Sequence, residues 1–139
     1  MVLDTPALLD TSVIIRYLTN DIPDLAARAR ALIASEIQLG ITTLAILEAA
    51  YVLGRPPYLH PYSAIIDGFV ELTRRENVVG IGIDIEHLTI ALLQCQRESP
   101  PSFGDALLAA TARSAGIHEV YSFDQRFERT GMRVVPMPH

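Results

Sequence analysis

The sequence predicts a single α/β domain in which a parallel sheet is flanked by helices on both faces. Short apolar segments typical of strands alternate with longer segments of helical periodicity along the whole chain, as in parallel α/β proteins. The 139 residues suit one domain of ordinary size, and half of them are apolar, so the chain can bury a substantial core. Because no repeat or linker interrupts this pattern, we expect one compact unit over residues 1–139.

Proline, glycine and capping residues set the limits of the predicted elements. The expected strands are residues 7–10, 37–42, 77–83, 118–123 and 133–137. The expected helices are residues 11–20, 21–36, 43–54, 62–76, 85–99 and 103–115. Pro23 lies in the first turn of the second helix, where proline is tolerated, and Asp21 is available to cap that helix. Gly54 and Gly116 stand at helix ends, where glycine is favoured, and three prolines predict a loop over residues 55–61.

Charge and composition exclude several classes of protein. The formal net charge of −5 and the isoelectric point near 5.2 argue against a protein that coats nucleic acid through a broad basic face. The single cysteine, Cys95, excludes an internal disulfide and a cysteine-based zinc site, and its apolar helical surroundings predict a buried thiol. The mean hydropathy of +0.28 suggests apolar surface that an oligomer or partner would cover.

The N-terminal segment predicts no targeting signal. It holds an acid and lacks the basic region of a signal peptide. The longest apolar stretch is too short to span a bilayer and contains Glu48, so no membrane segment is expected. We therefore expect a cytoplasmic protein.

Two aspartates are predicted at the carboxyl ends of strands. Asp10 ends the first strand between two apolar runs, and Asp124 directly follows the strand 118–123. Ligands of open α/β sheets bind at this edge of the sheet. Capping of the following helical segment explains each aspartate equally well, although Thr11 or Ser12 could cap the first helix without a charge.

Two further acids are predicted on the inner faces of helices. Glu48 falls on a predicted buried stripe, where a carboxylate is uncommon unless it meets a cation. That stripe consists of Leu44, Leu47, Glu48 and Tyr51. The alternative is a helix buried on most sides, with Glu48 at an edge. Asp105 also lies on an apolar helical face, and its alternative explanation is a capping box in the run SFGD.

Strand ends and helix faces of this kind can converge at one edge of a parallel sheet. Four neighbouring carboxylates repel one another unless a cation neutralises them. All eleven basic residues are arginine, so no lysine side chain is available as that cation. Oxygen ligands alone favour Mg²⁺ or Mn²⁺, and two such ions can activate water and stabilise the leaving oxygen of a phosphodiester. The predicted catalytic and metal-binding residues are Asp10, Glu48, Asp105 and Asp124.

Four sequence runs carry a family resemblance. LLDTSVII, TTLAILEAAYVL, SFGDALLAATARSAG and VYSFDQRFERTGMRVVP stand in the order and spacing of PIN-domain proteins, and the chain most closely resembles VapC-type toxins of type II toxin–antitoxin pairs. The resemblance implies a five-stranded parallel sheet, Mg²⁺- or Mn²⁺-dependent RNA cleavage with one or two ions per site, a homodimer and a cognate VapB-type antitoxin. It also implies that the same four acids bind the metal, with Thr11, Ser12 and Ser122 as polar neighbours.

The predicted reaction is hydrolysis of an RNA phosphodiester by water that the metal activates. Three arginines lie one or two turns from the acids and are expected to contact RNA phosphates: Arg16, Arg126 and Arg129.

Three alternatives differ from this prediction. One is a PIN-domain nuclease of RNA processing that is not a toxin, and another is an inactive scaffold that only binds a partner. The third is an enzyme that forms an aspartyl phosphate. The absence of lysine and the Thr11–Ser12 pair after Asp10 argue against the third.

Overall fold

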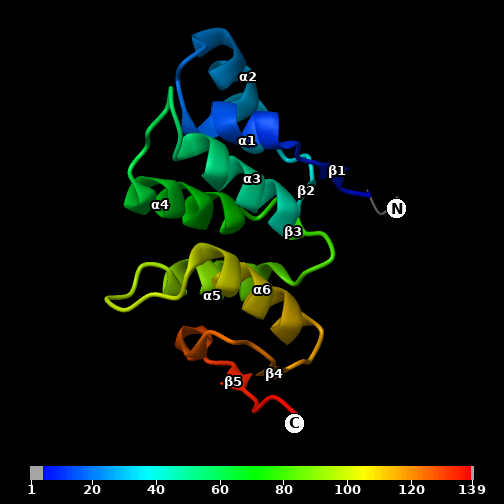
Figure 1. The fold of residues 1–139 in the computed structure, drawn as a ribbon. Helices are drawn as coiled ribbons and strands as arrows, with labels where there is room; N and C mark the ends of the chain where they lie inside the picture. The colour runs from blue at the N-terminus through cyan, green and yellow to red at the C-terminus, as the bar shows by residue number, and fades with distance from the viewer. Residues whose placement is uncertain (1–4, 139) are drawn as a thin grey trace.

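The computed structural model describes residues 5–138 and places helices and strands in the predicted order (Figure 1). The strands are β1 (Ala7–Leu8), β2 (Leu39–Ile41), β3 (Val78–Gly80), β4 (Glu119–Val120) and β5 (Arg133–Val134). The α-helices are α1 (Thr11–Leu18), α2 (Pro23–Ile33), α3 (Thr43–Leu53), α4 (Tyr62–Thr73), α5 (Ile85–Gln94) and α6 (Phe103–Ser114). A 3₁₀ helix, η1 (Gln125–Thr130), precedes β5. The predicted α/β class is confirmed, with elements shorter at their ends than the sequence suggested.

The strands of the described residues form two parallel sheets, of three and two strands, where one five-stranded sheet was expected. β1, β2 and β3 pair in parallel in that order, and β4 pairs in parallel with β5. Within residues 5–138, no pairing joins β1 to β4. The β4–β5 pair has a small core of its own, formed by Ala109 of α6 with Phe127 and Met132. This cluster packs the β4–β5 pair against α6. The pair lies beside α6, close to the C-terminus of the chain (Figure 1).

The main core joins the first sheet to the helices around it. Its largest fully buried side chains include Phe69, Ile14, Ile46 and Leu88, from four different helices. Cys95, at the end of α5, is buried as predicted. None of the helices within residues 5–138 is long and apolar enough to cross a membrane.

The prediction for the buried face of α3 is wrong. The side chains that α3 buries are Ala45, Ile46, Ala49 and Leu53. The predicted stripe faces solvent instead, with Leu44 72% exposed and Tyr51 59% exposed. Ala45 and Ala49 are small, so this side of α3 can approach α1 closely, and the bulkier side is left outside.

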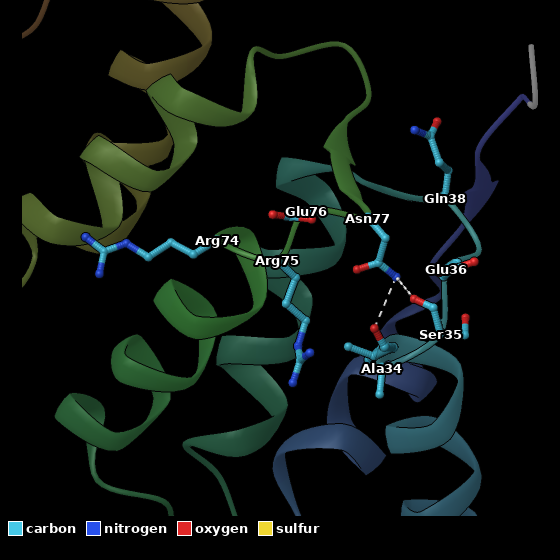
Figure 2. Close-up of a pocket in the computed structure, with 9 residues that line it drawn as sticks. Ala34, Ser35, Glu36, Gln38, Arg74, Arg75, Glu76 and Asn77 are labelled. Carbon is cyan, nitrogen blue, oxygen red and sulfur yellow. Dashed lines mark hydrogen bonds between the residues drawn. The ribbon is translucent and has the colours of Figure 1, made fainter.

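A polar hollow lies at the amino ends of β2 and β3, between the ends of α2 and α4 (Figure 2). The Asn77 side-chain amide there donates to the backbone carbonyls of Ile33, Ser35 and Ile37 at 3.0–3.1 Å. The Arg75 side chain points away from Asn77 (Figure 2). Its Nε donates a hydrogen bond to the Tyr17 hydroxyl at 3.1 Å. Ligands of open α/β sheets bind at the opposite, carboxyl edge. We therefore assign this hollow a structural role, in which Asn77 ties β3 to the end of α2.

Candidate functional site

Asp105 and Asp124 line the same pocket. Asp105 lies in the first turn of α6, and Asp124 lies between β4 and η1. The pocket measures about 420 Å³ and is lined by Tyr62, Pro100, Pro101, Ser102, Phe103, Asp105, Asp124, Arg126 and Arg129. Two of the four predicted acids and two of the three predicted arginines therefore come together.

The Asp105 carboxylate is held near the pocket by the start of α6. The Ser102 hydroxyl accepts a hydrogen bond from the Asp105 backbone N–H at 3.2 Å, which confirms the cap that the run SFGD predicted. Asp105 is half-buried, and within residues 5–138 its carboxylate makes no hydrogen bond or ion pair. Both carboxylate oxygens are therefore available to a cation.

The Asp124 carboxylate is engaged by its own neighbours. It caps η1 by accepting from the Arg126 backbone N–H at 2.9 Å. It also forms a bidentate pair with the Arg126 guanidinium, with Nε 3.0 Å from Oδ1 and Nη2 2.9 Å from Oδ2. These hydrogen bonds from Arg126 hold the pKa of Asp124 below its usual value. Ser122 orients the backbone here, because its hydroxyl accepts from the Asp124 N–H at 3.0 Å.

Arg126 is the ion-pair partner of Asp124 and lies beside Asp105 in the same pocket. The hydrogen bonds that the Arg126 guanidinium donates to Asp124 are the main cause that raises the pKa of Arg126, and the Asp105 charge adds to it. The Arg126 side chain is 73% exposed, and pairs this exposed are weak. Asp124 would therefore be able to exchange this exposed partner for a divalent cation, which would carry twice the charge of a guanidinium.

Asp10 caps the start of α1, as the alternative explanation for this aspartate predicted. It lies beyond the carboxyl end of β1 and caps α1, where Oδ2 accepts from the Ser12 hydroxyl at 2.6 Å and from the Ser12 N–H at 3.3 Å. The Ser12 hydroxyl is the main cause that lowers the pKa of Asp10. Thr11, the first residue of α1, is buried. Asp10 does not line the pocket that holds Asp105 and Asp124.

Glu48 and Arg16 also lie outside this pocket. Glu48 is exposed on the outer face of α3 and makes no hydrogen bond or ion pair within the described chain. Arg16 donates to Asp21 at 3.1 Å and to the Tyr58 hydroxyl at 3.0 Å, which joins the α1–α2 turn to the proline-rich loop. Asp21 therefore anchors this loop, and the residue at the cap position of α2 is Ile22, contrary to prediction.

Asp105 and Asp124 are the two predicted acids that could hold a divalent cation together, because they line one pocket. Within residues 5–138, no group of three or more His, Cys, Asp and Glu side chains is arranged to hold a metal. Mg²⁺ is commonly held by one or two carboxylates, with waters and substrate phosphate completing its coordination. Asp105 and Asp124 can supply those carboxylates, while Arg126 and Arg129 lie beside them.

The sequence did not predict the apolar wall of the pocket, which comes from three separate places. Tyr62 begins α4, while Pro100 and Pro101 precede α6 and Phe103 begins it. The Pro-Pro pair before a helix cap was visible in the sequence, but nothing in the pattern placed Tyr62 opposite it.

Comparison with known proteins identifies the family of the chain. No curated protein sequence matches the chain. The family model described as PIN domain matches residues 7–132, which include all four predicted acids. PIN domains are generally metal-dependent nucleases. The chain belongs to the PIN domain family.

Proposed function

We propose that this protein is an Mg²⁺- or Mn²⁺-dependent endoribonuclease whose site is centred on Asp105 and Asp124. The observation that carries the proposal is the convergence of these two carboxylates beside Arg126 and Arg129 in one pocket. Membership of the PIN family supports nuclease chemistry, and the basic side chains beside the acids suit a phosphodiester substrate.

Each group in the pocket has a task in this reaction. A bound divalent metal would supply an activated water and would neutralise charge that develops at the phosphodiester. Asp105, whose carboxylate has no partner within residues 5–138, and Asp124 would hold the ion. Arg126 and Arg129 would bind phosphate oxygens beside them. Ser122 keeps the Asp124 backbone in place through its hydrogen bond.

The remaining site residues are proposed on the resemblance. Asp10 and Glu48 are proposed as further metal-binding residues, with Thr11 and Ser12 as polar neighbours and Arg16 as a phosphate contact. Asp10 lies beyond a strand end, which supports its part of the proposal.

The biological role is proposed from the same resemblance. We propose a VapC-type toxin that acts in the cytoplasm as a homodimer and is inhibited by a VapB-type antitoxin. The solvent-facing apolar side chains of α3 support a protein partner, because contiguous exposed apolar surface marks an interface.

Cleavage of a labelled single-stranded RNA by the purified protein tests this function. We expect products with Mg²⁺ or Mn²⁺ and none with EDTA, because the carboxylates alone cannot activate water. We expect Asp10→Asn and Glu48→Gln each to lower the rate by about 10-fold or more, as loss of a metal-orienting group does. Cleavage in EDTA would contradict the metal requirement. Unchanged rates in both variants would remove Asp10 and Glu48 from the site.

A further inference from the structure

Two kinds of residue line the pocket, and we call them its charged wall and its apolar wall. One wall is charged and carries the two aspartates and two arginines described above. The other is apolar and is formed by Tyr62, Pro100, Pro101 and Phe103. A nucleotide shows the same division, with a charged phosphate joined to a flat base. Resting on the proposed function, we infer that the apolar wall is a subsite for one unpaired base of the RNA, with Tyr62 as the stacking side chain.

The Tyr62 ring is held firmly at the pocket wall. The Tyr62 and Phe103 rings form a T-shaped pair, with ring centroids 6.3 Å apart and planes at 90°. Phe103 stacks on Phe69, with centroids 6.1 Å apart, and Phe69 is fully buried. A series of three rings thus connects Tyr62 to the core. A ring fixed in this way loses little freedom when a base stacks on it.

The environment of Tyr62 keeps its hydroxyl neutral and its ring accessible. Partial burial, followed by a hydrogen bond with the buried Cys95 thiol, raises the pKa of Tyr62. The hydroxyl therefore carries no charge near neutral pH and is unsuited to act as a general base. The side chain is still 47% exposed. What it offers a ligand is an uncharged aromatic surface beside the acids.

The volume and composition of the pocket favour a base as the occupant. A volume of about 420 Å³ lies within the range of small-molecule sites and exceeds what a metal ion and one phosphate need. Aromatic stacking beside arginines is the usual combination in sites for single strands. Because a paired base is stacked inside its duplex and cannot enter, this subsite selects unpaired RNA. Stacking tolerates every base, so weak sequence preference is expected.

The test measures binding of a short single-stranded RNA that carries one 2-aminopurine, whose fluorescence falls when it stacks. All variants carry Asp105→Asn, which under the proposed function leaves the RNA uncleaved. We expect this parent to bind with quenching. Adding Tyr62→Leu should weaken the Kd about 10-fold or more and reduce the quenching, while Tyr62→Phe, which keeps the ring, should preserve both. Tyr51→Leu is the matched control, because Tyr51 is 59% exposed and does not line the pocket.

The outcomes separate this inference from the proposed function. Unchanged Kd and quenching in a folded Tyr62→Leu variant would overturn the base subsite and leave the nuclease site standing. Equal loss in Tyr51→Leu would likewise overturn it, as would binding of duplex RNA as tightly as the single strand. Absence of RNA binding in every variant would overturn the proposed substrate and the subsite together. Thermal unfolding of each variant verifies that the fold is retained.

Discussion

Asp124→Asn is expected to lower kcat for RNA hydrolysis by about 100-fold or more while leaving the protein folded. The neutral amide binds a divalent cation poorly, so the pocket would lose one of the two carboxylates proposed to bind the metal there. Asparagine caps helices as well as aspartate does, so η1 should keep its start. Single-turnover cleavage with saturating Mg²⁺ measures the effect, and thermal unfolding measures the stability.

Asp84→Asn provides a matched control for that variant. Asp84 is also a helix cap, accepting from the Glu86 N–H at 3.0 Å at the start of α5, and it does not line the pocket. We expect full activity from Asp84→Asn.

Induced expression of the wild type should arrest bacterial growth if it acts as a toxin, and Asp124→Asn should relieve the arrest. Undiminished cleavage by Asp124→Asn would remove this aspartate from the mechanism.

Gly80→Ala is expected to destabilise the fold by more than about 3 kcal/mol. A Cβ at Gly80 would lie 2.1 Å from the Ile83 carbonyl oxygen and 3.1 Å from the Ile85 nitrogen. Both are backbone atoms, so the clash cannot be relieved by turning a side chain. The segment that leaves β3 would have to move away from the sheet. Equilibrium unfolding in urea measures the loss of stability.

Gly104→Ala is the comparison for that substitution. A Cβ at Gly104, inside α6, meets nothing within 4 Å. Alanine is also the better helix former, so we expect stability equal to the wild type or higher by about 0.5–1 kcal/mol. If Gly80→Ala unfolded at the same urea concentration as Gly104→Ala, the close approach at β3 would be contradicted.

Local sequence signals predicted the elements of this fold well. Prolines, glycines and caps mark chain breaks through backbone physics that depends on few neighbours, which is why each helix and strand was found. The Ser102 cap of α6 is one such case, since a serine three residues before an acid marks a helix start. Asp21 is a contrasting case, because contacts with Arg16 and with Tyr58, which is distant in sequence, compete with capping.

Features decided by long-range packing were not predictable in this way. α3 is apolar on almost every side, so periodicity could not tell that the alanine face is buried and the Leu44 face exposed. Whether all strands join into one sheet depends on which of them pair with each other. β4 and β5 are only two residues long, so their own sequences do not determine their partners.

The candidate site was predictable in its residue types more than in its grouping. The prediction grouped four acids from strand ends and inner helix faces, and the structure places Asp105 and Asp124 of these in one pocket. The bidentate pair between Asp124 and Arg126 follows from the local turn of η1 and was not foreseen. Capping accounts for Asp10, and the outward face of α3 accounts for the exposure of Glu48.

Calorimetric titration with Mn²⁺ tests most directly whether Asp105 and Asp124 form a divalent-metal site. We predict that the wild-type protein binds Mn²⁺, that Asp105→Asn and Asp124→Asn each bind it about 10-fold more weakly or worse, and that Asp84→Asn binds it normally. Wild-type protein that takes up no Mn²⁺, or variants of both pocket aspartates that bind it unchanged, would contradict the account.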